Sequence, residues 1–272
     1  MNSSRDFAII LSRVAGEASG FLRDLAEEEG LDTIVGKGAG GDTTRKIDLV
    51  IEDYIISRLQ QQNLDLCIVT EEKGIIKRSN KCEYYVLVDP LDGSLNYVSK
   101  IPFVSISLVV YSAEKPFIDE GIAGVVSNVF LREIYSFDLQ GVYVNGTMVS
   151  RRESYNRGIV SIYTEDPYFV VKVRKILEEL MNTSIKFRTL GSAALESVYA
   201  ALGRIDLFIH STGKLRNFDV ACGINIAKKL GLKVLDLWGK TPKIRIDQIS
   251  VIPSLIIGSY AEELVKKYIM GS

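Results

Sequence analysis

The pattern of apolar and polar positions divides the chain into a first half of helices followed by strands and a second half in which strands and helices alternate. Residues 4–29 and 42–59 carry apolar side chains at helical spacing, so we expect two amphipathic helices there. A glycine-rich segment, 35–41, separates them. Apolar runs at 66–69 and 84–88 predict strands, and the alternation over 104–137 predicts antiparallel strands followed by a hairpin at 142–146.

The second half has the order typical of an α/β arrangement. Strands are expected at 159–163, 185–188, 205–209, 234–237, 250–252 and 255–257, and helices at 168–181, 193–202, 218–230 and 260–269. We therefore expect an N-terminal α+β half, 1–150, and a C-terminal α/β half, 151–272, in one compact unit. A ligand cleft between the two halves is the expected arrangement.

Composition narrows the kinds of chemistry that the chain can perform. With 33 basic and 34 acidic residues the formal charge is −1, and no basic stripe is long enough to follow a nucleic-acid backbone. No run of eighteen apolar residues predicts a membrane span. The cysteines (67, 82 and 222) are odd in number and widely spaced, which argues against a disulfide framework and favours a reducing, cytoplasmic setting. The single histidine, His210, argues against Ser-His-Asp catalysis and histidine-ligated zinc.

Carboxylates at the ends of predicted elements are the main candidates for chemistry. Asp89 and Asp92 follow the strand 84–88; we expect Pro90 to end this strand, Gly93 to allow close approach of a ligand, and Ser94 to cap a helix. Two mutually repelling carboxylates beside helix-start amides fit a site in which hard cations lie between the carboxylates and a phosphate. The alternative is an ordinary hydrated turn.

Three further carboxylates occupy similar positions. Glu71 follows the strand 66–69, Asp219 opens the helix 218–230, and Asp42 opens the helix over 42–59. Each has a structural alternative, as a solvated turn residue, a first-turn aspartate favoured by the helix dipole, and an N-cap, respectively. If the two strands are adjacent, however, Glu71, Asp89 and Asp92 would surround one small volume.

Four segments in order resemble the inositol monophosphatase superfamily. They are Gly41-Asp42-Thr43-Thr44 with Asp48, Thr70-Glu71-Glu72-Lys73-Gly74, Val88-Asp89-Pro90-Leu91-Asp92-Gly93-Ser94-Leu95-Asn96-Tyr97, and Asn217-Phe218-Asp219-Val220-Ala221-Cys222-Gly223. The resemblance implies a layered αβαβα sandwich, with an antiparallel sheet in the first half and a mixed sheet in the second. It also implies a Mg²⁺-dependent phosphomonoesterase of carbohydrate metabolism, active on inositol-1-phosphate, fructose-1,6-bisphosphate or both, and forming homodimers or homotetramers.

The resemblance also implies roles for individual residues. Glu71, Asp89 and the carbonyl of Leu91 would hold one Mg²⁺, and Asp89, Asp92 and Asp219 a second, with Mn²⁺ able to substitute. The amides of Gly93 and Ser94 would bind the phosphate, and Asp42 with Ser94 would orient and deprotonate the attacking water. A third Mg²⁺ near Glu71 and the glycine-rich segment is left open.

The side that binds the alcohol is less defined. Arg188 and Ser192 resemble residues that border the substrate in the family, while Lys214 and Arg216 would meet a second phosphate or simply offset nearby carboxylates. Ser94 in place of threonine keeps the hydroxyl, whereas Phe218 in place of tryptophan and Gly231-Leu232 in place of Gly-Gly leave lithium sensitivity open. The alternatives are a 3′-phosphoadenosine-5′-phosphate phosphatase of the same superfamily and a non-catalytic scaffold.

Overall fold

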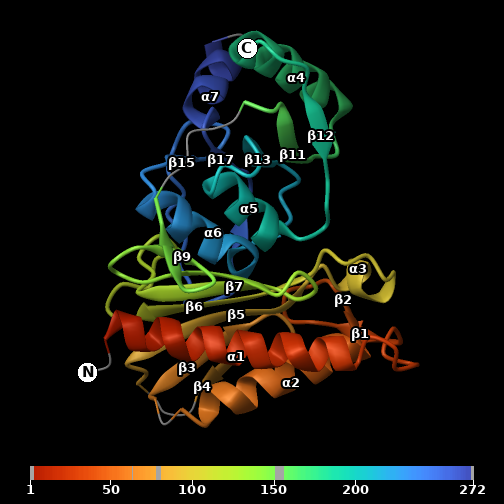
Figure 1. Cartoon of the computed structure of the whole chain (residues 1–272), viewed down its shortest axis with the longest axis vertical. Coiled ribbons are helices and arrows are strands. Elements are labelled where there is room, and N and C mark those ends of the chain that lie inside the picture. Colours follow the sequence, from red (N-terminus) through yellow and green to blue (C-terminus); the bar gives the residue numbers. More distant parts are fainter. Residues whose placement is uncertain (1–2, 63, 78–80, 151–155, 271–272) are drawn as a thin grey trace.

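The computed structural model describes residues 3–62, 64–77, 81–150 and 156–270, and stacks helices and sheets in alternating layers (Figure 1). The elements of the first half are α1 (Ser4–Asp24), β1 (Ile34–Lys37), β2 (Thr43–Arg45), α2 (Lys46–Gln60), β3 (Leu66–Thr70), β4 (Gly74–Lys77), β5 (Tyr84–Asp92), α3 (Ser94–Val98), β6 (Ser105–Ser112), β7 (Ala123–Asn128), β8 (Glu133–Phe137), β9 (Val142–Val144) and β10 (Thr147–Val149). The elements of the second half are β11 (Ile159–Tyr163), α4 (Pro167–Met181), β12 (Lys186–Arg188), α5 (Ala193–Ala201), β13 (Leu207–His210), β14 (Leu215–Arg216), α6 (Asn217–Lys229), β15 (Val234–Leu235), β16 (Val251–Ile252), β17 (Leu255–Gly258) and α7 (Ala261–Met270).

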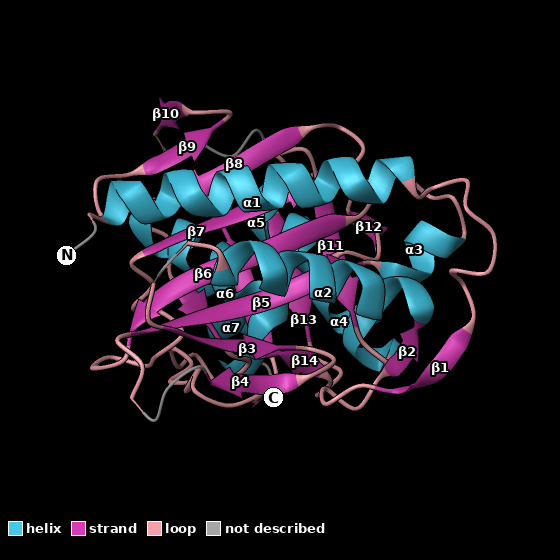
Figure 2. Cartoon of the chain, turned by 90° about the horizontal axis from the view of Figure 1, so that it is seen from below, coloured by secondary structure: helices cyan, strands magenta, loops and turns pink. Residues whose placement is uncertain are grey.

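The larger sheet has the order β10-β9-β8-β7-β6-β5-β3-β4, and its strands pair antiparallel except for the parallel pair β3 and β5. Helices α1 and α2 lie side by side across one face, as Figure 2 shows from below. Phe7, Leu11 and Leu22 of α1 and Ile51 of α2 are buried against the sheet. The apolar stripes that predicted these helices therefore form the first layer of the core.

The smaller sheet has the order β12-β11-β13-β17-β15 and is mixed, since β11 runs parallel to β12 and β13 while β17 runs antiparallel to its neighbours. Helices α5 and α6 lie between the two sheets, and α4 and α7 cover the outer face (Figure 1). Leu87 of β5 and Phe208 of β13 belong to one continuous core around α5 and α6. This confirms the predicted αβαβα sandwich. The boundary expected near 150 falls beside residues outside the described ranges and stays a prediction.

Several local expectations are wrong. The first helix ends at Asp24 rather than Glu29, and β5 continues past Pro90 to Asp92. The strand accommodates the proline because its register with β6 shifts between Asp89 and Asp92, where no ladder hydrogen bond from residue 90 is required. The second helix begins at Lys46 rather than at Asp42, which lies in the turn of the β1–β2 hairpin, so the alternative that Asp42 is the N-cap of α2 is wrong as well. Ser94 does not cap α3 either, because it is the first residue of that helix and Gly93 is the N-cap.

The expectation of no disulfide is also corrected. Cys67 and Cys82 are paired as a disulfide with their Cα atoms 5.6 Å apart, and Cys222 is free and buried. Cys67 on β3 lies opposite both Lys77 of β4 and Tyr85 of β5, so the connection from β4 to β5 begins and ends beside it. This return of the chain, which sequence spacing did not reveal, brings Cys82 to Cys67.

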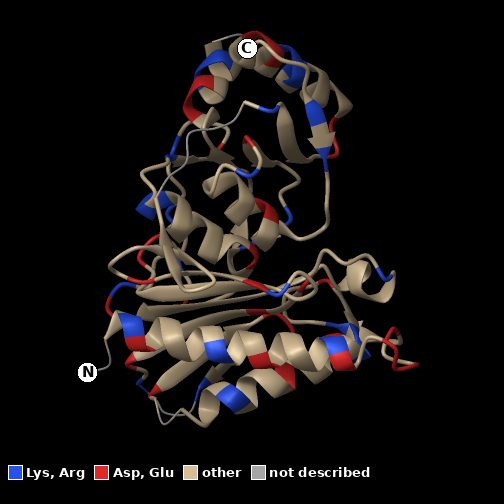
Figure 3. Ribbon diagram, viewed as in Figure 1, with Lys and Arg blue, Asp and Glu red and all other residues tan. Residues whose placement is uncertain are grey.

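No helix in the described part of the chain is both long enough and apolar enough to cross a membrane. Acidic and basic residues both occur along α1 and α2, so neither helix carries a band of one sign (Figure 3).

Candidate active site

The parallel pair β3 and β5 brings the first two predicted ligands to the same edge of the larger sheet. Thr70, the last residue of β3, lies opposite Val88 of β5, so Glu71, just after β3, and Asp89, within β5, lie at the same level on neighbouring strands. The carboxyl ends of adjacent parallel strands are a common place for ligand sites in α/β folds. The two strands are therefore adjacent, which is the condition under which Glu71 and Asp89 were expected to lie close together.

Asp89 is the most enclosed carboxylate of the group. It is 1% exposed, and its Oδ1 atom has no hydrogen-bond partner among the described residues. Burial is the main cause that raises the pKa of Asp89 well above its usual value, and the charges of Asp92 and Glu71 add to it. A buried, unpartnered carboxylate oxygen is costly unless something else neutralises it.

Asp92 faces the start of α5. Its Oδ2 atom accepts hydrogen bonds from Ser192 Oγ at 2.5 Å, from Ala194 N at 2.8 Å and from Ser105 Oγ at 3.3 Å, while Oδ1 accepts from Ala193 N at 3.2 Å. Burial raises its pKa to about 6, although these donors act in the opposite direction. The structure thus places Ser192, a predicted substrate-binding residue, in direct contact with a predicted metal ligand.

Asp219 lies in the first turn of α6. Its Oδ2 atom accepts the backbone N–H of Arg216 at 2.6 Å, which closes the turn at the helix start. Burial raises the pKa of Asp219 to about 8, with Asp92 contributing through repulsion. Burial likewise raises the pKa of Glu71, and Asp219 is the largest of the neighbouring charges that act on it. Helix α6 therefore brings the fourth carboxylate into the same electrostatic field.

The donor set agrees with a divalent metal site. Glu71, Asp89, Asp92 and Asp219 supply only oxygen atoms, which hard cations such as Mg²⁺ prefer, and the buried Asp89 Oδ1, which has no partner among the described residues, is available to such a cation. Within the described ranges no group of three acidic, histidine or cysteine side chains already converges as a finished metal cluster. The hydrogen bonds from α5 turn Asp92 toward that helix. These residue types are therefore suitable ligands for Mg²⁺, and the assignment of each residue to a metal ion stays a prediction.

Asp42 and Ser94, the predicted pair that orients water, have separate partners. The Asp42 side chain is 66% exposed and lies 3.4 Å from Arg216 Nη2. Ser94 is the first residue of α3, and its Oγ accepts from Arg45 Nη1 at 3.4 Å. No hydrogen bond joins Asp42 to Ser94 among the contacts described.

Asp48 lies in one of the segments that resemble the family, but no role of its own was predicted for it from the sequence. It is 3% exposed, its Oδ2 accepts from Arg45 N at 2.6 Å, and its Oδ1 lacks a partner among the described residues. Its charge is one of those that raise the pKa of Glu71. The signal was available: Asp48 lies beside Ile47 on the helix face that carries Ile51, so its side chain had to be buried.

Gly93 has φ +92°, and a Cβ there would lie 2.9 Å from the carbonyl oxygen of Gly191. Glycine is therefore required for close approach to another backbone segment. Leu91, whose carbonyl is a predicted ligand, is 3% exposed.

The predicted basic residues of the substrate side do not gather. Arg188 is exposed and donates to the carbonyl of Phe187 at 2.8 Å, while Lys214 is exposed and pairs with Glu165. Arg216 is mostly buried and donates from Nη2 to the carbonyl of Gly40 at 2.6 Å and from Nε to the same oxygen at 3.0 Å. Arg216 is thus engaged with the β1–β2 hairpin.

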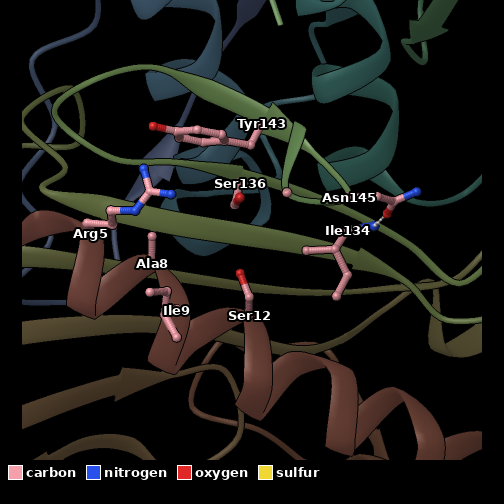
Figure 4. A pocket seen from close by; sticks show the side chains of 9 residues that line it. Arg5, Ala8, Ile9, Ser12, Ile134, Ser136, Tyr143 and Asn145 are labelled. Atoms are coloured by element: carbon pink, nitrogen blue, oxygen red, sulfur yellow. Dashed lines mark hydrogen bonds between the residues drawn. The ribbon is translucent and has the colours of Figure 1, made fainter. Parts of the chain in front are cut away.

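A cavity of about 260 Å³ lies elsewhere, between α1 and the strands β8 and β9 (Figure 4). Arg5 and Ile9 of α1 face Tyr143 and Ile134 across it. None of the predicted site residues lines this cavity, so it is separate from the carboxylate group.

Comparison with known proteins agrees with the fold. The family model described as the inositol monophosphatase family matches residues 5–268. The inositol-1-monophosphatase of Aeropyrum pernix is 33% identical, covering 95% of this chain and 94% of that protein. The fructose-1,6-bisphosphatase of Pyrococcus furiosus is also 33% identical, covering 83% and 82%. A solved structure from Pyrococcus horikoshii, described as having similarities to inositol-1 monophosphatase, is 28% identical with a TM-score of 0.76, covering 99% and 98%. The chain therefore belongs to the inositol monophosphatase family and is a phosphoric monoester hydrolase.

Proposed function

We propose that the protein is a Mg²⁺-dependent phosphomonoesterase that hydrolyses inositol-1-phosphate, fructose-1,6-bisphosphate or both. The observation that carries this proposal is the group of carboxylates at the ends of β3 and β5 and the start of α6, in which Asp89 Oδ1 is buried without a partner. Relatives of both kinds, an inositol-1-monophosphatase and a fructose-1,6-bisphosphatase, support the substrate class.

In this proposal Glu71, Asp89, the carbonyl of Leu91, Asp92 and Asp219 hold the metal, as two or three ions. When bound, the ions neutralise the phosphate oxygens and lower the pKa of water, which is the chemistry that cleavage of a phosphate ester with a poor leaving group requires. Mn²⁺ would substitute, because it accepts the same oxygen ligands.

The other residues position the reacting groups. The amides of Gly93 and Ser94 are proposed to bind phosphate oxygens, and the Ser94 hydroxyl to orient the attacking water. Asp42 was predicted to accept the proton from that water; Asp48 is a second candidate, because it is buried and has an unpartnered oxygen. Comparing Asp42→Asn with Asp48→Asn separates the two, since only loss of the proton acceptor lowers kcat while leaving phosphate binding in place.

The basic residues on the substrate side leave both the monophosphate and the bisphosphate within the proposal. Lys214 and Arg216, proposed to meet a second phosphate, are engaged with Glu165 and with Gly40. Arg188 and Ser192 remain the proposed neighbours of the alcohol. A bisphosphate would have to draw Lys214 away from its exposed partner, which costs little because exposed ion pairs are weak.

The test is phosphate release from inositol-1-phosphate, fructose-1,6-bisphosphate and 3′-phosphoadenosine-5′-phosphate, each with Mg²⁺, with Mn²⁺ and with chelator. Hydrolysis of either sugar ester that is lost with chelator supports the proposal. Preference for the adenosine substrate favours the alternative phosphatase, and no hydrolysis of any substrate favours a scaffold. The proposed cytoplasmic location and the homodimer or homotetramer need separate measurements, the latter by light scattering.

A further inference from the structure

Two fully buried glutamates contact turns that lie next to the carboxylate group in the chain, and neither has a role in the proposed site. Glu52 on α2 and Glu196 on α5 are each 0% exposed. Acidic side chains are rarely buried completely unless they are paired or hydrogen-bonded. Each glutamate, one in each half of the molecule, accepts hydrogen bonds from a turn beside the carboxylate group.

Glu52 holds the turn that follows β3. Its Oε1 atom accepts from Thr70 Oγ1 at 2.8 Å, from Glu72 N at 2.9 Å and from Lys73 N at 3.2 Å. These donors lie on both sides of Glu71. The backbone that presents Glu71 to the site is therefore fixed by one buried carboxylate oxygen from α2.

Glu196 holds the turn before α5 in the same way. Its Oε1 atom accepts from Ser161 Oγ at 2.6 Å and from Leu190 N at 3.0 Å, and its Oε2 atom accepts from the Tyr163 hydroxyl. The Tyr163 oxygen in turn accepts from Gly191 N at 2.9 Å. Both amides of this turn are thus held, directly or through tyrosine.

The turn fixed by Glu196 leads directly into the groups that hold Asp92. Ser192 Oγ donates to Asp92 at 2.5 Å, and Ala194 N donates at 2.8 Å. Movement of residues 190 and 191 would therefore displace the donors that set the orientation of the Asp92 carboxylate.

We propose that Glu52 and Glu196 are positioning residues, which fix the turns that orient Glu71 and Asp92 for metal binding. The metal part of this inference rests on the proposed function. Groups that orient metal ligands typically change metal affinity by about 10- to 100-fold when they are removed.

The two glutamates differ in what a glutamine can replace. In Glu52 all three donors meet Oε1, so Glu52→Gln keeps the acceptor and adds an amide at Oε2, which has no partner among the described residues. In Glu196 the two oxygens share the donors, so Glu196→Gln places an amide where the Tyr163 hydroxyl now donates. Glutamine should therefore restore more of the wild-type behaviour at position 52 than at position 196.

The experiment measures amide hydrogen exchange in metal-free protein together with Mg²⁺ affinity by calorimetry, for the alanine and glutamine variants. Glu52→Ala should speed exchange at Glu72 and Lys73 but not at Leu190, and Glu196→Ala should do the reverse. Each alanine variant should weaken Mg²⁺ binding by about 10-fold or more. Glu178→Ala, on the exposed side of α4, is the control that should change neither quantity.

Exchange that stays at the wild-type rate in both alanine variants would overturn the proposal, as would Mg²⁺ affinity that does not change while the local amides are released. If an alanine variant fails to fold, Thr70→Val and Tyr163→Phe each remove a single donor, and should speed local exchange to a smaller extent. Absence of phosphatase activity in the wild type would instead refute the proposed function and leave the exchange result standing.

Discussion

Ser192 Oγ donates a 2.5 Å hydrogen bond to Asp92 Oδ2, although 100 positions separate the two residues in the chain. The contact joins the end of β5, in the larger sheet, to the start of α5, which lies between the sheets. A residue of the expected substrate side thereby sets the direction of an expected metal ligand. Substrate and metal binding are therefore expected to affect one another at this point.

Asp92→Asn and Asp219→Asn should leave the fold intact and lower phosphatase activity by ~10³-fold or more, because positioning by the cations is lost. Both residues already accept backbone N–H groups, which an amide oxygen can still accept. Steady-state phosphate release with Mg²⁺, beside thermal unfolding, measures the two effects. Asp32→Asn, on the exposed loop after α1, is the control. Turnover that is unchanged in either site variant would exclude that residue as a metal ligand.

The metal-free protein should lose stability as pH rises from 6.5 to 8. Burial raises the pKa of Asp219 from 3.8 to about 8 and that of Glu72 from 4.5 to about 7, so in this range the folded chain binds more protons than the unfolded chain. The free energy of unfolding therefore falls as pH rises through these values. Burial lowers the pKa of His210 from 6.5 to about 4. Between these values the unfolded chain binds the extra proton, so His210 makes the free energy of unfolding rise with pH.

Thermal unfolding with chelator at pH 6.5, 7, 7.5 and 8 measures this slope. Mg²⁺ should raise the melting temperature most at pH 8, because the ions replace protons that have already left. Asp219→Asn should flatten the upper part of the slope. A melting temperature that rises with pH in chelator would contradict the assigned pKa shifts.

The sequence was sufficient for most of the fold because its signals were local. The apolar stripe with Phe7 and Leu11 predicted a helix with one face in the core, and both side chains are buried there. The Asn145-Gly146 pair predicted a tight hairpin turn, and both of these residues have positive φ. The β1–β2 hairpin was missed because Ile34 and Val35 are exposed and its glycines read as a loop.

The site was less predictable, because its partners come from distant parts of the chain. Glu71 and Asp89 could be placed together once their strands were taken as neighbours. No sequence spacing shows that Arg216 meets Gly40 or that Ser192 meets Asp92, since those contacts depend on how α5 and α6 lie against the larger sheet. Asp42 was assigned through the resemblance to the family, whereas the burial of Asp48 follows from its place on the helix face.

Arg216→Ala should loosen the β1–β2 hairpin beside the site. The guanidinium donates twice to Gly40 O and approaches Asp42, while Gly40 N donates to the carbonyl of Glu71 at 2.8 Å. Without Arg216 the hairpin turn loses the two hydrogen bonds to Gly40 O and keeps the one from Gly40 N to Glu71. Amide exchange at Gly41 should therefore accelerate, and KM should rise. Arg216→Lys should recover part of the effect. Lys233→Ala, which removes an exposed ion pair, is the control. Exchange at Gly41 that does not change would show that the arginine does not hold the hairpin.

Gly223→Ala should destabilise the layer between the sheets. Helices α5 and α6 pack so closely that a Cβ on Gly223 would lie 2.0 Å from Ser197 Oγ and 2.6 Å from Ser197 Cβ. Because the contact includes the Cβ atom, rotation of the serine side chain cannot relieve it, and we expect a loss of about 1–3 kcal/mol. Gly20→Ala on α1, where the nearest atom is 3.8 Å away, should instead gain up to about 1 kcal/mol from helix propensity. Denaturant unfolding of both variants checks the contrast. A Gly223→Ala variant as stable as the wild type would mean that α5 and α6 can move apart without cost. The start of α5, which holds Asp92, and the start of α6, which carries Asp219, would then not be fixed relative to each other.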